Sequence, residues 1–205
     1  MIVGKKGTLW MLLGVMLLMG ALGLTIYNLY EAKRAQETSE HAAEQLREAI
    51  RAEKTNDIKT DDIPEYVTHP DKEMPAILIG NSYYIGLIEI PDLGISLPVI
   101  GGEWSYDKLL QAPCRYSGSV YKDDLVIAAH NYESHFGNIH HLESGSDVYF
   151  IDVEGHVFEY EVGWLETLEP SESEVMKDAK DWDLSQFTCT NSGQQRYTIR
   201  CIKNY

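Results

Sequence analysis

The longest uninterrupted apolar stretch of the chain lies close to its N-terminus. Residues 9–27 read LWMLLGVMLLMGALGLTIY and contain no charged side chain. About 20 apolar residues are needed to cross the hydrocarbon core of a bilayer as a helix. Apolar side chains cover every face, which argues against a core helix of a globular domain. Trp10 at the start and Tyr27 and Tyr30 at the end lie where aromatic rings favour the lipid interface. We therefore predict a membrane anchor over residues 1–30.

The charges that flank this stretch orient it only weakly. Lys5 and Lys6 precede it, and Lys33 and Arg34 follow it. A very short leading segment that need not be translocated favours an N-in, C-out arrangement. A cleaved signal peptide is the alternative, but the run is long for one and residues 20–23 make a poor cleavage site. We expect a single-pass membrane protein whose remaining chain lies outside the cytoplasm.

Residues 31–74 are predicted to form a helical stalk and a linker. The stalk, residues 31–54, is rich in helix-forming residues and contains neither Gly nor Pro. Its apolar positions form a thin stripe that is too weak to indicate a coiled coil, so a solvated helix is expected. The stripe consists of Ala35, Ala42, Leu46, Ala49 and Ile50. Pro64, Pro70 and many charges in the following stretch are typical of a linker.

From residue 75 to residue 205 the pattern changes to short apolar runs separated by turn residues. Residues 125–129 are continuously apolar, as in a buried strand, and the turn at residues 152–155 indicates a hairpin. Strands are predicted at residues 83–90, 95–100, 125–129, 148–151, 157–162, 187–190 and 196–202, with a short helix near residues 105–111. Many short strands with turns between them favour a closed or nearly closed β-barrel.

Composition narrows the possible partners. The chain has 17 Lys and Arg against 32 Asp and Glu, a formal net charge of -15. Nucleic acid is therefore excluded as a partner, because phosphate binding needs a positive surface. The 3 cysteines, Cys114, Cys189 and Cys201, are too few for a disulfide-built scaffold, and an odd number leaves at least one thiol free. A bond between Cys114 and Cys201 is a lesser alternative to separate thiols.

Three residue types that can perform acyl transfer together stand at strand ends. His130 ends the buried run, Cys189 ends a later run, and Arg196 begins the last predicted strand. A thiolate can attack a carbonyl, an imidazolium can protonate the leaving amine, and a fixed cation can stabilise the oxyanion. These residue types alone are a weak signal, because a core cysteine is more often inert packing than a nucleophile.

The local sequences around these residues are more specific. Their order and spacing resemble those of the sortases, over roughly residues 83–203. The matching segments are Leu125 to Tyr132, His135 to Ile139, Phe187 to Thr190, Gln195 to Arg200, the turn Leu142 to Asp147 and the opening Ile88 to Pro91. The resemblance implies an eight-stranded β-barrel with short helices and a Cys–His–Arg active site. We expect neither a cofactor nor a metal. The N-terminal anchor and stalk also fit.

The resemblance further implies a reaction and its partners. Cleavage of a C-terminal sorting motif of the Leu-Pro-x-Thr-Gly kind in an exported protein would leave a thioester at Cys189. The acyl group would then pass to an amine of a peptidoglycan precursor or of another protein such as a pilin. Thr188, Asn131 and Arg200 are expected to bind substrate. Many members read Thr-Leu-x-Thr-Cys before the nucleophile, whereas residues 185–189 here keep only the final Thr-Cys. The acidic stretch 169–183 is expected to wall the substrate groove.

Arg196, rather than Arg200, is expected to stabilise the oxyanion. Both arginines share a face of the last strand, because side chains alternate along a strand. The loop 190–195 turns back from Cys189 directly into Arg196. Arg200 lies roughly 13 Å further on, at about 3.3 Å per residue.

The other histidines are interpreted more simply. His135 is expected on the surface near the mouth of the site, and His156 exposed beside a hairpin turn. His140 and His141 are expected to point to opposite faces of a strand, without metal-ligand partners. Two other functions stay open: an exported cysteine peptidase that uses water as acceptor, and a non-catalytic anchored scaffold.

Overall fold

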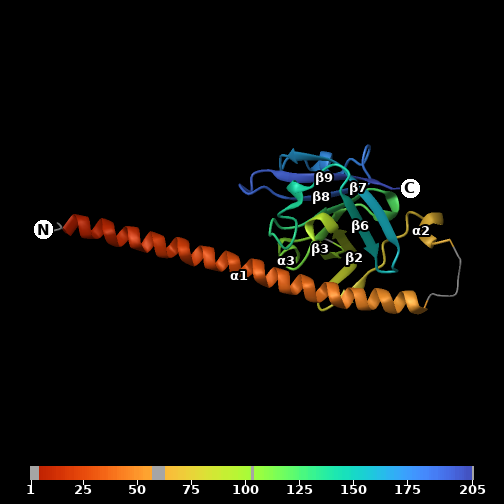
Figure 1. Ribbon diagram of the computed structural model, residues 1–205, viewed down its shortest axis with the longest axis horizontal. Coiled ribbons are helices and arrows are strands. Elements are labelled where there is room, and N and C mark those ends of the chain that lie inside the picture. The colour runs from red at the N-terminus through yellow and green to blue at the C-terminus, as the bar shows by residue number, and fades with distance from the viewer. Residues whose placement is uncertain (1–4, 57–62, 103, 205) are drawn as a thin grey trace.

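The computed structural model describes residues 5–56, 63–102 and 104–204. The first four residues of the predicted anchor, residues 57–62 of the predicted linker, and Tyr205 lie outside the described residues. Figure 1 shows one long helix, α1 (Lys5–Asn56), whose C-terminal half lies along a β-barrel while its N-terminal half extends away from it.

The N-terminal half of α1 has the properties of a membrane-spanning helix. Its most apolar window has a mean hydropathy of 2.2 and is 0% buried within the protein. Leu9, Leu17 and Leu24 are each more than half exposed. Length and composition alone qualify this helix as a candidate membrane span, as the sequence predicts.

The expectation of a solvated stalk is wrong, because the C-terminal half of α1 packs against the barrel. Ala42, Leu46 and Ile50 join one buried apolar cluster with Leu87 and Ile100 of the barrel. The apolar stripe predicted along this part of the helix is thin because several of its side chains are alanines. Small side chains allow a helix to approach a sheet closely. Side chains recurring every three to four residues form one continuous face of a helix.

The second half of the predicted linker is also docked. Its short helix α2 (Glu65–Thr68) places the Tyr66 ring in a stack with Tyr121, at 4.8 Å between ring centroids. The same ring lies 5.2 Å from Phe158. Lys122 holds Asp71 by an ion pair of 2.8 Å. This stretch is therefore packed against the surface of the barrel.

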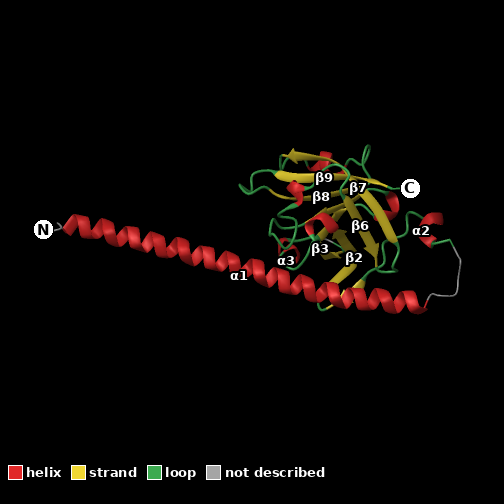
Figure 2. Ribbon diagram, viewed as in Figure 1, coloured by secondary structure: helices red, strands yellow, loops and turns green. Residues whose placement is uncertain are grey.

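The barrel is formed by eight of nine strands in one sheet (Figure 2). The strands are β1 (Ile77–Ile79), β2 (Ser82–Ile90), β3 (Ile95–Ile100), β4 (Cys114–Ser117), β5 (Leu125–Ala128), β6 (Asp147–Asp152), β7 (Val157–Leu168), β8 (Leu184–Cys189) and β9 (Arg196–Lys203). Their order is β1-β2-β3-β4-β5-β8-β9-β7-β6, and β6 pairs back onto β2 to close the barrel. β1 pairs with the start of β2 outside the closed ring. The predicted eight-stranded barrel is confirmed.

Short helical turns join the strands. The predicted helix near residues 105–111 is α3 (Tyr106–Leu109), capped by the Ser105 side chain, which accepts from the Lys108 amide. The others are α4 (Ser173–Lys177) and the 3-10 turns η1 (Pro91–Leu93), η2 (Val120–Lys122) and η3 (Ile139–His141). β1 and β4 were not predicted.

The barrel interior is apolar and orders the strands that carry the site. Ile88, Ile127, Phe150, Leu184 and Ile199 are all fully buried in the main core cluster. Burial of such side chains contributes about 1.5–3 kcal/mol each. The continuous apolar run of β5 is explained by its place in the ring between β4 and β8, where all four of its residues are buried.

Candidate active site

The β8–β9 hairpin brings Cys189 and Arg196 together. Cys189 is the last residue of β8, Arg196 is the first residue of β9, and the two are direct cross-strand partners. The connecting loop is closed by hydrogen bonds from the Thr190 amide to the Gln195 carbonyl (2.9 Å) and from the Gly193 amide to the Thr190 carbonyl (2.8 Å). Directly opposed residues in an antiparallel pair lie about 4.5–5.5 Å apart at Cβ, so the thiol and the guanidinium stem are neighbours.

His130 reaches the same point from the other side of β8. β5 runs parallel to β8, with Ala128 opposite Phe187, and the Ala129 amide donates to the Phe187 carbonyl at 3.1 Å. Continuing this register by two residues places His130 beside Cys189. The sequence-predicted triad therefore comes from the ends of three neighbouring strands.

His130, Cys189 and Arg196 line one pocket of about 280 Å³. One wall is apolar and largely aromatic, and a second wall comes from the connection between β7 and β8. The first wall includes Trp104, Tyr106, Leu109, Tyr116, Ala128 and Phe187, and the second includes Glu169, Pro170, Glu172, Ser173 and Met176. The first half of the stretch 169–183, which was expected to wall the groove, lines this pocket, whereas no residue from 177–183 is among the described residues that line it.

The aromatic wall is held by ring contacts. Tyr116 lies perpendicular to Phe187, with ring centroids 5.1 Å apart, and Trp104 lies 5.7 Å from Tyr116. Edge-to-face pairs of this kind are favourable beyond their buried area. Phe187 belongs to the same strand as Cys189, so this wall is fixed relative to the nucleophile.

The surroundings of His130 set its acid–base properties. Burial lowers the pKa of His130 below its usual value. Its Nε2 is buried without a hydrogen-bond partner in the described part of the chain. The ring stacks on Tyr132 at 5.0 Å between centroids. A lowered pKa keeps the ring mostly neutral at neutral pH, so that it can first accept a proton, and makes the imidazolium that then forms a stronger acid toward a leaving group.

The three cysteines differ in how deeply their thiols are buried. Cys114 and Cys201 are buried, and burial raises the pKa of each thiol to about 12. Cys189 is partly exposed to the pocket. All three thiols are free, so the lesser alternative of a bond between Cys114 and Cys201 is wrong. A nucleophile must be accessible and able to ionise, which among these thiols leaves Cys189.

The two arginines of β9 have different surroundings. Arg196 is half-buried and donates from Nη1 to the carbonyls of Gln195 (2.9 Å) and Gly193 (3.2 Å). Within the described ranges it forms no ion pair, so its charge is available to the pocket. Arg200 is 1% exposed and pairs with Glu166 at 2.6 Å.

Further bonds fix Arg200 as a structural cation. It donates to the Ser185 hydroxyl and to the carbonyls of Met176 and Val175, each at 3.0 Å. Its guanidinium also lies 4.7 Å from the centre of the Trp182 ring. These contacts tie the β7–β8 connection to the barrel and leave Arg200 outside the pocket.

The sortase domain model matches residues 88–203, more than half of the chain. This chain belongs to the sortase family. Sortase A of Listeria monocytogenes serovar 1/2a is 26% identical over 125 residues, which cover 57% of this chain and 56% of that protein. The aligned part therefore spans just over half the length of this curated relative.

Solved structures share the fold at lower identity. A Clostridium perfringens sortase D5 transpeptidase has a TM-score of 0.59 at 20% identity, covering 82% of this chain and 99% of that one. Sortase C-1 of Actinomyces oris has a TM-score of 0.55 at 18% identity, covering 79% and 99%. A lid mutant of Corynebacterium diphtheriae sortase A has a TM-score of 0.54 at 18% identity, covering 82% and 96%. The likeness extends over nearly all of each solved chain.

The substrate-binding residues expected in this sortase are placed differently from the triad. The Thr188 side chain is 1% exposed, and its hydroxyl donates to the Ala129 carbonyl at 2.9 Å, which ties β8 to the end of β5. Thr188, Arg200 and Asn131 are not among the described residues that line the pocket. The buried Thr188 and Arg200 are therefore assigned structural roles. Asn131 is exposed beside His130 and stays a prediction.

Two expectations for other histidines are wrong. His135 is 1% exposed rather than on the surface, because the chain folds back after His130 and α1 covers it. His140 and His141 lie in the 3-10 turn η3 rather than in a strand, and their rings are 3.9 Å apart. Sequence reasoning placed His135 on the surface because nothing in its local pattern shows that a distant helix covers it.

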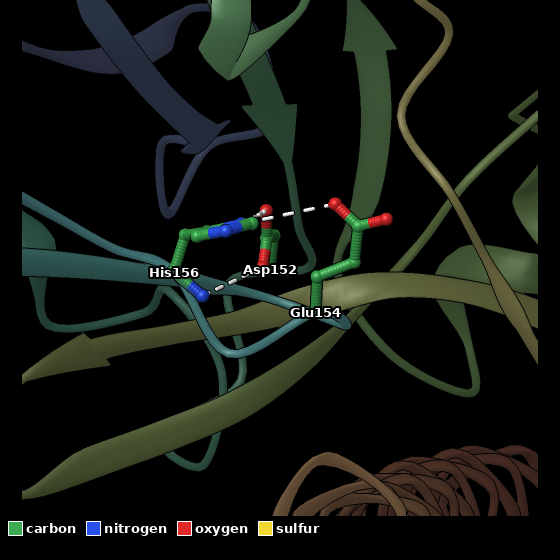
Figure 3. Close-up of side chains that lie close together, drawn as sticks. All are labelled: Asp152, Glu154 and His156. Carbon is green, nitrogen blue, oxygen red and sulfur yellow. Dashed lines mark hydrogen bonds and ion pairs between the residues drawn. The ribbon is translucent and has the colours of Figure 1, made fainter. Parts of the chain in front are cut away.

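A further cluster lies at the β6–β7 hairpin (Figure 3). His156 Nδ1 is 2.8 Å from Asp152 Oδ2 and 3.8 Å from Glu154 Oε2, and the ligand atoms all lie within 4.8 Å, close enough for a metal ion. Each carboxylate already has a partner of its own. The Tyr121 hydroxyl donates to Asp152 at 2.9 Å, and Lys72 Nζ lies 3.5 Å from Glu154. We assign this cluster to the docking of the linker on the barrel, not to a metal.

Proposed function

We propose that this sortase is a membrane-anchored cysteine transpeptidase that uses Cys189 as its nucleophile. The observation that carries the proposal is the convergence of Cys189, His130 and Arg196 at neighbouring strand ends around one pocket. The catalytic domain would lie outside the cytoplasm, anchored by the apolar half of α1.

The reaction proceeds in two halves. The Cys189 thiolate attacks the scissile carbonyl, the new C–S bond forms, and Arg196 stabilises the oxyanion. His130 gives its proton to the leaving amine as the C–N bond breaks, and a thioester remains. An incoming amine then attacks the thioester, loses its proton to His130 and displaces the thiolate. General acid–base catalysis of this kind contributes about 10²–10⁴-fold.

The pocket supports an exported protein with a C-terminal sorting motif as the acyl donor. Its aromatic wall offers apolar contact to the aliphatic and proline side chains of a Leu-Pro-x-Thr-Gly-like motif. The acceptor would be an amine of a peptidoglycan precursor or of another surface protein such as a pilin.

The fate of the acyl group tests this proposal. The full chain in detergent micelles is incubated with a library of sorting-motif peptides and an amine acceptor, and the products are read by mass spectrometry. Ligated product that depends on the acceptor is expected. Hydrolysed peptide alone, at every acceptor concentration, would assign a cysteine peptidase. An inert protein would assign a scaffold.

A further inference from the structure

The helix that leaves the membrane also touches the loop that follows His130. We call residues 31–39 of α1 the juxtamembrane segment and residues 130–137 the histidine loop. Ala35 and Ser39 lie one helical turn apart, and each is 1% exposed. The apolar window ends near Tyr27, about one turn before Glu31 at 3.6 residues per turn. The anchor therefore continues without interruption into this contact.

The histidine loop is a compact turn. The Phe136 amide donates back to the His130 carbonyl at 3.2 Å, and the amides of His135 and Gly137 both donate to the Tyr132 carbonyl at 2.9 Å. A Cβ at Gly137 would meet the Asn131 carbonyl oxygen at 2.6 Å, so the close turn requires glycine there. A loop folded this tightly transmits a shift at one end to the other.

Two aromatic rings, those of Tyr132 and His135, extend the packing of His130 through this loop. The His130 ring stacks on Tyr132 at 5.0 Å with an interplanar angle of 27°. Tyr132 in turn lies 5.7 Å from the His135 ring. His135 is 1% exposed, and neither of its ring nitrogens makes a geometrically well-formed hydrogen bond among the described residues. The Ala35 carbonyl of α1 acts on this ring only as a weak acceptor, so His135 contributes here mainly by filling space.

The buried positions of the juxtamembrane segment belong to a stretch of α1 that acts on the ionisation of these rings. Burial, and to a smaller extent the neighbouring His130, lower the pKa of His135 to about 4, while the Ala35 carbonyl opposes both effects. Burial raises the pKa of Tyr132, and the Glu31 carboxylate raises it further. Ala35 and Glu31 are thus neighbours of the two rings that support His130.

We propose that the juxtamembrane segment is part of the active-site scaffold, and that His135 is a positioning residue that transmits its packing through Tyr132 to His130. The anchor then has a second role beyond attachment, because it holds the general acid in place. The catalytic meaning of this inference rests on the proposed function, whereas the packing itself can be measured without turnover.

The test uses two perturbing variants and two matched controls in the full chain in detergent micelles. Ala35→Leu introduces a larger side chain at the buried position of α1 that faces the histidine loop. Gln36→Leu places the same side chain at the adjacent exposed position. His135→Ala removes the ring, and His135→Phe restores its volume without a titratable group.

The first measurement is the titration of His130 by NMR, with ¹³C-labelled histidine and assignment from His130→Gln. The titratable and charged groups around His130 are Cys189, Arg196, Glu169 and Glu172 of the pocket together with Tyr132 and His135 of the loop, and Glu31 of α1 acts on Tyr132. Loosening the loop admits water, so the midpoint of His130 should rise in Ala35→Leu and His135→Ala. It should stay within a few tenths of a unit in Gln36→Leu and His135→Phe.

The second measurement is kcat and KM for acyl transfer. A displacement of about 1 Å can cost about 10²-fold in rate, so kcat should fall about 10-fold or more in Ala35→Leu and His135→Ala with KM within about twofold. Unchanged His130 midpoints in both perturbing variants would overturn the inference. Loss of activity in His135→Phe equal to that in His135→Ala would also overturn it, because the imidazole itself would then be needed. A wild-type protein without acyl transfer would refute the proposed function, while the titration would still decide the packing.

Discussion

At the residue scale, Arg196 and Arg200 show how one strand face can carry two different roles. Both side chains lie on the same face of β9, as the alternation of the strand predicts. Arg196 lines the pocket, whereas Arg200 is bound by Glu166 and by backbone carbonyls. Arg196→Ala should slow acylation about 10²–10³-fold, as expected for loss of an oxyanion donor, with the unfolding midpoint unchanged.

Arg200→Ala should have the opposite effect. It leaves the buried side of Glu166 and its two carbonyl partners without a donor, which should lower the free energy of unfolding by about 3 kcal/mol. Acylation rates and denaturant unfolding measured on both variants separate the two roles. A slow but fully stable Arg200→Ala would transfer the oxyanion role to that residue.

The buried His135 predicts a specific dependence of stability on pH. Its folded pKa of about 4 lies below the unfolded value of about 6.5. The unfolded state therefore binds more protons between these values, and the free energy of unfolding falls as the pH falls from about 6.5 to about 4. The loss at low pH is about 3 kcal/mol, at roughly 1.4 kcal/mol per pKa unit.

His135→Phe should remove this part of the pH dependence. Urea unfolding of the wild type and of the variant at pH 7 and pH 4 measures it, and groups common to both proteins cancel in the comparison. Equal losses in the two proteins would show that His135 is not held neutral by burial.

The residues of the triad could be predicted from sequence because each lies within a specific local segment at a strand end. The burial of His135 could not, since it depends on a helix about 100 positions earlier in the chain. Thr188 was expected to touch substrate for the same reason: its position beside Cys189 is local information, whereas its bond to Ala129 is not.

At the element scale, α1 was predicted as a helix but without its partner. Periodicity indicates which face is apolar, not which sheet that face covers. Leu46 lies at the centre of the contact and is 0% exposed, whereas Glu48 is exposed. Leu46→Ala should lower the free energy of unfolding by about 2–4 kcal/mol.

Thermal unfolding of the full chain in micelles, with Glu48→Ala as the control, measures this contribution. Equal midpoints for the two variants would mean that the helix does not stabilise the barrel. The missed strands β1 and β4 have only 3 and 4 residues, too short for alternation to be recognised.

At the scale of the whole molecule, closure of the barrel creates the site. His130 and Cys189 are far apart in the chain, and they meet because the ring order places β5 next to β8 and β8 next to β9. Strand propensity cannot supply that order, and only the resemblance to the sortases indicated it. The chain carries a formal net charge of -15, so carboxylates are abundant. The oxyanion role proposed for Arg196 requires a guanidinium that no carboxylate neutralises, and Arg196 forms no ion pair among the described residues.

The central claim is that Cys189 forms the acyl-enzyme, and intact-protein mass spectrometry tests it most directly. The full chain is mixed with a sorting-motif peptide at a concentration that gives turnover and quenched in acid. The wild type and Cys201→Ala should both carry one acyl adduct that hydroxylamine removes, and peptide mapping should place it on Cys189. Cys189→Ala should carry none. An adduct on Cys189→Ala, or one that maps to Cys114 or Cys201, would contradict this account.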